Sequence, residues 1–396
     1  MNIMSTTFQA GFASAVGVAL LSACGGGGGS GGTLAAGDTG TLKVAMTDAP
    51  ACGFDKVNVT VSKIRVHKSG SASENDSGWS EITLSPAKKI DLLTLQNGIM
   101  TELGQTALPA GRYTQIRLVL TENGAGSLAN SVVRTGSATE VAIDTPSAIQ
   151  SGIKLNNEFE ITANTTTELV LDFDACKSIV TKGNGGYLLK PVIGVIPKMT
   201  SGSITGHISG ATSGTLVSVQ QNGVVVKSTV PDSTGAFTLS PVPASTSYVV
   251  VISSSGKTTA AVTGVPVTAG SSTALSTSTA PIALTASATA TVSGTALPLT
   301  ALATVRATQS LTATGPVIEV GSQAADSVTG NYSLTLPTAA PLLGKFGTLP
   351  IAFSAAETAA AAGKYTIEAS ATGFARQTAD VDIKAAGATK NFTLTP

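Results

Sequence analysis

Residues 57–66 read Val-Asn-Val-Thr-Val-Ser-Lys-Ile-Arg-Val, an alternation of apolar and polar side chains that is typical of a β-strand. The valines at 57, 59 and 61 share one parity, whereas the apolar residues at 64 and 66 take the other. Such a slip would turn the later side chains to the wrong face unless an extra residue bulges out. We therefore predict a bulge at Ser62–Lys63, beyond which three side chains point together toward solvent: Lys63, Arg65 and His67.

Segments of the same period continue on both sides of this strand, separated by Gly, Asn, Pro and Ser. They cover residues 41–46, 116–120, 158–161, 169–173 and 187–196. The composition agrees, because 12% of the 396 residues are charged and 4% are aromatic, while Gly and Pro are frequent. We expect an all-β chain of three β-sandwich domains in tandem, at residues 40–198, 201–285 and 287–396.

The charge balance excludes one class of function. Lys plus Arg and Asp plus Glu are 23 each, so no basic excess points to nucleic acid. The chain has two histidines and three cysteines, too few for a His-rich metal centre or an all-cysteine zinc site. We expect no organic cofactor and no enzymatic activity.

The N-terminus carries a targeting pattern. Residues 10–23 form an uncharged apolar run of signal-peptide length, too short to span a membrane. The run ends in Leu21-Ser22-Ala23-Cys24, which resembles the lipobox of bacterial lipoproteins, in which the cysteine is acylated and becomes the new N-terminus. We expect a signal peptide at 1–23 and a tether at 24–39, because Gly25–Gly32 is too glycine-rich to pack into a core. The resemblance implies a lipid anchor on Cys24.

The same resemblance implies a location. Gly25 replaces the aspartate that acts as an inner-membrane retention signal in enteric bacteria, so the protein is expected at the outer membrane, facing the periplasm or the cell surface. An exported chain meets an oxidising compartment, where thiols pair. With Cys24 acylated, we expect a disulfide between Cys52 and Cys176.

The last two domains resemble each other. Each opens with an apolar residue two positions before a glycine and has a central G-x-[FY]-x-L segment and a later Y-x-[VI] segment. This pattern is similar to the transthyretin-like, or carboxypeptidase regulatory-like, repeat, a seven-stranded sandwich that serves as a spacer or binding module. Any Greek-key sandwich of this size remains an alternative.

The first domain carries several motifs in a fixed order. They include Thr47-Asp48-Ala49-Pro50, Leu108-Pro109-Ala110-Gly111-Arg112-Tyr113, Leu171-Asp172-Phe173-Asp174 and Leu189-Lys190-Pro191. Together they resemble a bacterial lipoprotein domain family of unknown function (domain of unknown function 4382). The resemblance implies a fold and a location and no activity. Gly111-Arg112-Tyr113 also matches Gly363-Lys364-Tyr365, so all three domains are expected to share one sandwich plan.

Acidic side chains alternate with apolar ones in two segments, Glu158-Phe159-Glu160-Ile161 and Leu171-Asp172-Phe173-Asp174. If residues 162–167 form a hairpin turn, Glu158, Glu160, Asp172 and Asp174 crowd onto one face, where like charges repel. Either nearby cations balance them or a calcium ion does. The candidate cations are Lys154, Lys177 and Arg117.

No pattern of a catalytic centre accompanies these acids. There is no G-x-S-x-G elbow, and His67 and His207 both fall in strands, where a surface position is expected. We therefore expect a lipid-anchored envelope protein that presents a binding or spacer surface, toward a glycan or another envelope protein. A carbohydrate-binding protein is the alternative, although Trp79 is the one tryptophan available for stacking on sugars. The candidate recognition loops are residues 69–78, 123–137 and 339–350. The alternative is that these loops only connect strands and bind nothing.

Overall fold

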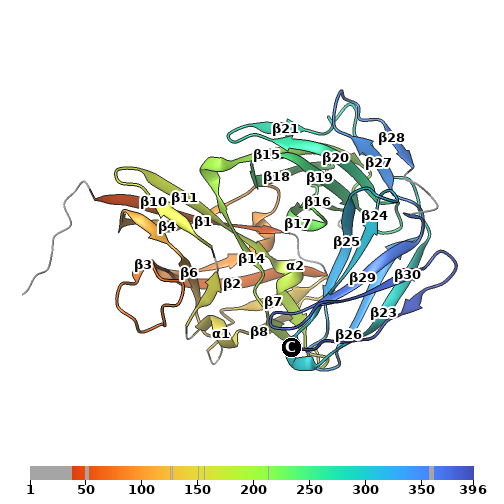
Figure 1. Cartoon of the computed structure of the whole chain (residues 1–396). Coiled ribbons are helices and arrows are strands. Elements are labelled where there is room, and N and C mark those ends of the chain that lie inside the picture. Colours follow the sequence, from red (N-terminus) through yellow and green to blue (C-terminus); the bar gives the residue numbers. More distant parts are fainter. Residues whose placement is uncertain are drawn as a thin grey trace, which may run out of the picture.

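The computed structural model describes residues 38–49, 53–124, 126, 128–149, 151–155, 157–212, 214–355 and 361–396. Figure 1 shows three groups of β-strands that follow one another along the chain. The predicted all-β class is confirmed, since helices are limited to short turns. None of the helices in the described part is long and apolar enough to span a bilayer. The predicted signal peptide, Cys24, the predicted tether and Cys52 lie outside the described residues.

The N-terminal unit, residues 38–197, contains two larger sheets and a small two-stranded one. One sheet has the order β14-β11-β1-β4, and the other has the order β12-β13-β8-β7-β2-β6-β9 with β3 paired to β2. Strand β1 pairs in parallel with β11, which places Thr47, Asp48 and Ala49 beside Asp172, Phe173 and Asp174. The strands are β1 (Thr39–Ala49), β2 (Phe54–His67), β3 (Ser80–Asp91), β4 (Thr101–Pro109), β5 (Gly111–Tyr113), β6 (Gln115–Leu120), β7 (Ser131–Arg134), β8 (Glu140–Asp144), β9 (Ile153–Leu155), β10 (Phe159–Ile161), β11 (Thr166–Asp174), β12 (Ile179–Thr181), β13 (Tyr187–Leu189) and β14 (Ile193–Pro197).

The predicted bulge in β2 is confirmed. The register of β2 shifts between Val61 and Lys63 against both of its neighbours, β3 and β6. The extra residue keeps Ile64 and Val66 in the core, where each is at most 2% exposed. Beyond the bulge, Lys63, Arg65 and His67 share the outer face but are only half-exposed, because a loop and Trp79 lie over them.

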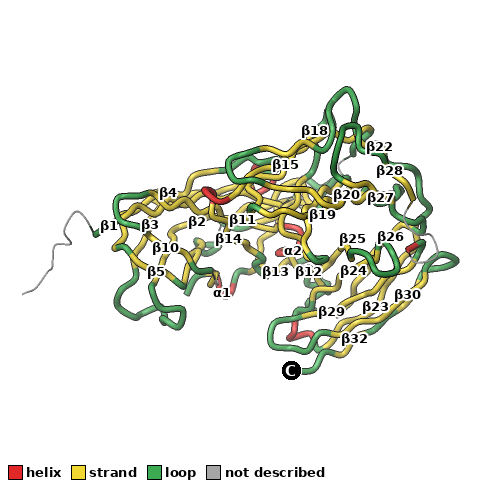
Figure 2. The backbone as a smooth tube through the Cα atoms, turned by 45° about the horizontal axis from the view of Figure 1, so that its top comes forward, coloured by secondary structure: helices red, strands yellow, loops and turns green. Residues whose placement is uncertain are grey.

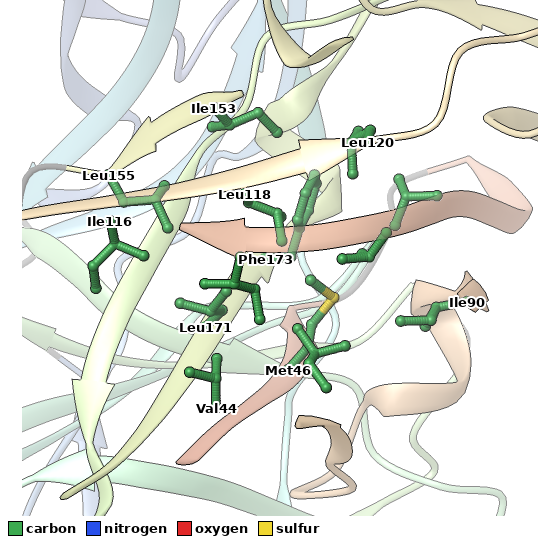
Figure 3. Close-up of a cluster of buried hydrophobic side chains, with 14 of the residues drawn as sticks. Val44, Met46, Ile90, Ile116, Leu118, Leu120, Ile153, Leu155, Leu171 and Phe173 are labelled. Atoms are coloured by element: carbon green, nitrogen blue, oxygen red, sulfur yellow. The ribbon is translucent and has the colours of Figure 1, made fainter. Parts of the chain in front are cut away.

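The core of this unit lies between its two large sheets. Figure 3 shows Val44 and Met46 of β1, Leu171 and Phe173 of β11, and aliphatic side chains of β6 and β9 meeting there. Phe173, Leu171 and Met46 are fully buried. Burial of such side chains contributes about 1.5–3 kcal/mol each, which accounts for the alternating pattern of the sequence.

The middle and C-terminal units have the same topology. In the middle unit, residues 201–283, one sheet has the order β18-β15-β21 and the other begins β17-β16-β19-β20; in the C-terminal unit, residues 289–396, the orders are β26-β23-β31 and β25-β24-β29-β30. The expected relationship between the two is therefore confirmed at the level of fold. The strands are β15 (Ser201–Ser209), β16 (Leu216–Gln221), β17 (Val224–Thr229), β18 (Ala236–Pro243), β19 (Ser245–Ser253), β20 (Ala260–Val267), β21 (Ser272–Ala274), β22 (Ile282–Ala283), β23 (Thr289–Leu297), β24 (Thr304–Ser310), β25 (Val317–Ala324), β26 (Asn331–Pro337), β27 (Leu342–Lys345), β28 (Phe353–Ala355), β29 (Lys364–Ser370), β30 (Gln377–Asp382), β31 (Ala388–Thr389) and β32 (Phe392–Thr393).

One tyrosine contact recurs in all three units. A strand ends at a proline, and a tyrosine of a later strand donates its hydroxyl hydrogen bond to that proline's carbonyl. This arrangement corresponds to the tyrosine corner of β-sandwiches. It explains why the Gly-x-Tyr motifs of the first and third units match. The pairs are Tyr113 with Pro109 at 3.0 Å, Tyr248 with Pro243 at 2.9 Å, and Tyr365 with Pro337 at 2.6 Å.

The insertion in the C-terminal unit is not a free loop. Its strand β27 pairs in parallel with β20 of the middle unit, and β28 pairs with β27, so that they complete a six-stranded sheet (Figure 1). Its apolar side chains pack on the core of the middle unit, with Ile351 only 9% exposed. Residues 342–355 therefore form an arm that joins the two sandwiches. The predicted recognition loop at 339–350 overlaps this arm, and its residues 342–345 form a paired strand instead of a loop.

The helical turns are short and lie at strand ends. The turn η1 follows β3, and α2 follows β11 with Asp174 as its N-cap. They are η1 (Leu92–Leu95), α1 (Pro146–Ile149), α2 (Ala175–Ser178), η2 (Lys198–Thr200) and η3 (Leu299–Ala301).

Candidate functional site

The four predicted carboxylates do not come together. Strand β10, which carries Glu160, pairs with β5, whereas β11 lies between β1 and β14 in a different sheet. The expected hairpin between β10 and β11 is therefore wrong, because the chain crosses from one sheet to another at residues 162–165. Glu158 forms an ion pair with Arg112. Within the described residues, no three His, Cys, Asp or Glu side chains are arranged to hold a metal ion, so the predicted calcium set is not formed.

Asp172 instead forms a buried ion pair across two units. Its Oδ1 lies 2.5 Å from Nζ of Lys227, which belongs to β17 of the middle unit. Asp172 is 7% exposed and Lys227 is 2% exposed. The alternation of the sequence correctly turns Asp172 away from its own core. Its cation was missed because Lys227 lies 55 residues further along the chain, in a different domain.

Asp48 lies beside this pair on β1 and is 1% exposed. Its Oδ1 accepts a hydrogen bond from the backbone N–H of Ala175 at 3.2 Å, and its Oδ2 has no partner in the described residues. Burial raises the pKa of Asp48 well above its usual value, and the nearby carboxylates of Asp172 and Asp174 raise it further. Both effects disfavour the charged form of the Asp48 carboxyl group.

A second ionic group connects the N-terminal unit to the C-terminal one. Lys177 of α2 lies 3.5 Å from Asp174 Oδ2 and 3.4 Å from Glu319 Oε1 on β25. Burial lowers the pKa of Lys177, but the carboxylates of Glu319 and Asp174 outweigh it and leave the pKa raised. Burial raises the pKa of Asp174 despite its contact with Lys177. Of the three cations proposed to balance the acidic segment, Lys177 is the one that does so, at Asp174.

The ionic chain continues within the C-terminal unit. Arg306 lies 3.4 Å from Glu319 and donates two hydrogen bonds to Glu368, at 2.9 and 3.1 Å. It also donates to the backbone carbonyl of Gly223 in the middle unit at 2.8 Å. The side-chain amide of Gln220 in the middle unit donates to the backbone carbonyl of Glu319 and accepts from its backbone N–H, both at 2.8 Å. The three units therefore meet at one charged junction, which encloses a cavity of about 120 Å³.

Further polar contacts hold the N-terminal unit against the other two. Asn97 accepts a hydrogen bond from the N–H of Thr238 and donates to the carbonyl of Ala236. Lys190 donates to the carbonyl of Leu302 at 2.5 Å, and burial lowers its pKa. Because these contacts are directional, they fix the orientation of the units as well as their contact.

Trp79 lies on the outer face of β2 and β6, over a pair of arginines. The guanidinium carbons of Arg65 and Arg117, which are opposite each other in the sheet, lie 4.5 and 4.8 Å from the ring centroid. The His67 ring lies 5.0 Å away, and the indole N–H donates to the carbonyl of Ser73. Trp79 therefore offsets the repulsion between two cations, a structural role.

The predicted recognition loop at 69–78 is tied to the sheet beneath it. The side-chain amide of Gln115 donates to the carbonyls of Ser69, Gly70 and Ala72, and Arg117 donates to Ala72 as well. Part of the second candidate loop, 123–137, forms β7. His207 lies on β15, where Ser276 bonds its backbone N–H and C=O.

A concave region lies between the N-terminal and C-terminal units. It is a cleft of about 660 Å³. Residues of β12 and β13 line one wall, and residues of β25 and β26, the edge strands of the two sheets of the C-terminal unit, line the other. Figure 2 shows the backbones of β12 and β13 next to β25. The side chains that line it include Phe54, Arg134, Tyr187, Gln323, Ser333 and Thr335.

The fold defines a tandem β-sandwich protein whose units are joined by buried charges. Residues 39–191 match the model of a family described as Domain of unknown function (DUF4382). This supports the resemblance found for the N-terminal unit. No named family supports the transthyretin-like assignment of the later units, which stays a prediction.

Comparison with solved structures gives distant similarities. The Bacillus anthracis TIE protein is 13% identical with a TM-score of 0.17, and the alignment covers 90% of this chain and 50% of that one. A type II cohesin–X-dockerin complex of Acetivibrio cellulolyticus is 32% identical over 22% of this chain and 58% of that one, with a TM-score of 0.18. A Streptococcal ancillary pilin is 10% identical with a TM-score of 0.17 and coverages of 91% and 100%. This chain thus spans about half the length of the first of these proteins. No curated protein matches the chain.

Proposed function

We propose that this protein is a lipid-anchored protein of the cell envelope that uses three sandwiches, joined into one body, as a non-enzymatic support for a binding surface. The observation that supports it best is the charged junction. Asp172 with Lys227, and Lys177 with Glu319, tie the first unit to both others. A chain of independent domains has no need of buried ion pairs between them, because desolvating charges is costly. A body of fixed shape suits a spacer that carries a surface at a set distance from the membrane.

The anchor is the part of this proposal that the N-terminal sequence supports. Cys24 is the residue expected to carry the lipid, and the glycine tether separates it from β1. The outer membrane is the proposed location.

The test of the anchor is fractionation and labelling in cells. Wild-type protein is expected in the membrane fraction and to take up radioactive palmitate, whereas Cys24→Ser is expected to do neither. The matched control is the double variant Cys52→Ser/Cys176→Ser, which removes the proposed disulfide and keeps the anchor. Membrane retention and labelling of Cys24→Ser equal to wild type would overturn the proposal.

The side of the membrane is decided separately. Protease is added to intact cells, with a periplasmic protein as the marker of a closed envelope. Loss of the protein means display on the surface, and protection means a periplasmic role with an envelope partner. Carbohydrate binding, the alternative function, cannot use Trp79 as its main platform, because that ring already covers Arg65 and Arg117.

A further inference from the structure

The cleft between the N-terminal and C-terminal units has the size and position of a ligand site. Its volume of about 660 Å³ falls in the ~300–1,000 Å³ range of small-molecule sites, which often lie between domains. The charged junction fixes both walls, because Lys177 and Glu319 join α2 to β25. Thr181 and Asp326 join the walls again at 2.7 Å. The cleft is therefore preformed.

Arg134 lines this cleft from the end of β7 and is exposed. In the described residues its guanidinium makes no ion pair and no hydrogen bond. Every other arginine of the chain has such a partner there: Arg65 with Glu81, Arg112 with Glu158, Arg117 with Gln115 and two carbonyls, Arg306 with Glu368, and Arg376 with Glu368. A guanidinium presents a rigid fork of donors that matches a carboxylate. Arg134 is thus available to an anionic group in the cleft.

Tyr187 lines the same cleft and, unlike the other tyrosines, has a side chain without a hydrogen-bond partner within the described residues. The residue is 5% exposed, and its hydroxyl, which is not among the fully buried polar atoms, makes no hydrogen bond within the described residues. The other four tyrosines each donate to a backbone carbonyl: Tyr113, Tyr248, Tyr332 and Tyr365. The hydroxyl therefore reaches the cleft as an unused donor and acceptor, which a water molecule or a ligand can bond.

Phe54 connects these two residues. It is the cross-strand neighbour of Arg134 in the pairing of β2 with β7. Its ring also packs edge-on against that of Tyr187, with centroids 5.5 Å apart and an interplanar angle of 75°. One wall of the cleft therefore combines a cation, a hydroxyl and an apolar ring surface.

The opposite wall presents neutral polar side chains and one carboxylate, that of Asp326, which accepts a hydrogen bond from Thr181. Ser322, Gln323, Ser333 and Thr335 line it from β25 and β26. Gln323 Oε1 accepts the backbone N–H of Ser333 at 3.0 Å, which covers a donor on the free edge of β26. That contact disfavours the addition of a peptide strand to this edge, since such addition uses these backbone donors. It also turns the amide of Gln323 into an ordered donor, and amides and hydroxyls are suited to sugar hydroxyls.

We propose that this cleft binds an acidic saccharide, whose carboxylate pairs with Arg134 and whose hydroxyl groups bond Tyr187 and the polar side chains of β25 and β26. The Phe54–Tyr187 pair gives the sugar ring an apolar surface. The inference rests on the proposed binding role and gives that role a site and a ligand class. It does not depend on the lipid anchor, so the two can fail separately.

The test uses the purified full chain on an array of oligosaccharides that contain uronic or sialic acids, together with neutral ones. Binding is expected on acidic members alone. For the strongest acidic oligosaccharide, titration calorimetry then compares the natural sugar with its carboxyl-reduced form, which has the same ring configuration without the charge. Reduction is expected to weaken binding about tenfold or more, as loss of a charge-assisted hydrogen bond does.

Two variants locate the site, and one serves as the matched control. Arg134→Gln is expected to weaken binding of the acidic sugar about tenfold or more and to leave the reduced sugar unaffected. Tyr187→Phe keeps the ring and is expected to weaken binding of both about threefold to tenfold. Arg112→Gln, an exposed arginine paired with Glu158, is expected to bind as wild type does. Equal melting temperatures confirm that the variants are folded.

Three results would overturn the proposal. The first is an array on which no acidic oligosaccharide is retained. The second is binding that Arg134→Gln and Tyr187→Phe leave unchanged, which would place the sugar elsewhere. The third is capture of an extended peptide that competes at this cleft, which would assign the site to a strand partner.

Discussion

Replacing Lys227 with methionine is expected to destabilise the junction more than any exposed substitution. The ammonium group is buried and lies 2.5 Å from Asp172, and its loss leaves that carboxylate 7% exposed without its cation. Asp48 and Asp174 lie near enough to raise the cost, because repulsion from Asp172 is, after burial, one of the causes of the raised pKa of each. Removing one partner of a buried pair costs about 3–5 kcal/mol, and methionine keeps most of the volume of the lysine chain.

The assay is urea unfolding followed in two ways. Trp79 is the single tryptophan and lies in the N-terminal unit, so its fluorescence reports on that unit, while circular dichroism reports on all strands. Lys227→Met should lower the fluorescence midpoint. The control is Lys198→Met, which breaks the ion pair of Lys198, whose side chain is 44% exposed, with Glu168, whose side chain is 21% exposed. Its loss should lower the free energy of unfolding by less than about 1 kcal/mol. A loss below about 1 kcal/mol for Lys227→Met would refute the assignment of the junction as a stabilising contact.

Four further substitutions or measurements test other parts of the structure. Because the native pKa of Asp48 is raised, its contribution to stability falls as the pH rises from about 4 toward that pKa. Asp48→Asn should therefore make the urea midpoint depend less on pH and should stabilise the protein at pH 7 by roughly 1–3 kcal/mol. A pH dependence of the midpoint equal to that of wild type would contradict this. Tyr365→Phe leaves the carbonyl of Pro337 unpaired and should cost about 1–3 kcal/mol in thermal unfolding, against little for Tyr187→Phe. Ile351→Asp should free the arm, seen as protease cleavage within residues 338–363, and resistance equal to wild type counts against it. A non-reduced digest should link Cys52 to Cys176, and two free thiols would exclude the bond.

The features that could be predicted from the sequence are those encoded within one strand. The change of parity between Val57 and Ile64 was sufficient to predict the bulge, because each buried apolar residue must point to the core face of the sheet. The two later units could be paired from their opening and central strands, which have the same positions in both sheets. In each case the signal is local and strong.

Strands with little burial were not predicted. β3 reads Ser-Glu-Ile-Thr-Leu-Ser-Pro-Ala-Lys-Lys-Ile-Asp, in which most residues are exposed and Pro86 interrupts the run. Such a strand is held by its pairing with β2, which places Lys88 opposite Val61 and Ile82 opposite Ile64. Residue propensity and periodicity do not reveal which strands pair, so β3 and β4, the next strand along the chain, are absent from the strands predicted from the sequence.

The candidate site was the least accessible to sequence reasoning, because it arises between units. The sequence pattern correctly placed acidic side chains on one face of β11. The structure shows that Asp172 on this face pairs with Lys227 of another sandwich. Arg134 and Tyr187 have no motif around them. Their one signal is the absence of an internal partner, which is a property of the folded chain alone.

The position of the arm explains how two similar sandwiches come to act as one. In the middle unit, Pro243 and Tyr248 of the tyrosine corner are five residues apart, whereas in the C-terminal unit Pro337 and Tyr365 make the same contact across 28 residues. The extra residues therefore lie within the corner and leave the sandwich unchanged on both sides. Their length is used for β27 and β28, which add to the edge of the middle unit at β20. An edge that would otherwise be open to aggregation is thus covered by the next sandwich, and the same contact fixes the angle between the two. Because Arg306 and Gln220 join these sandwiches again at Gly223 and Glu319, the pair meets the N-terminal unit as a single wall, and this makes a preformed cleft possible.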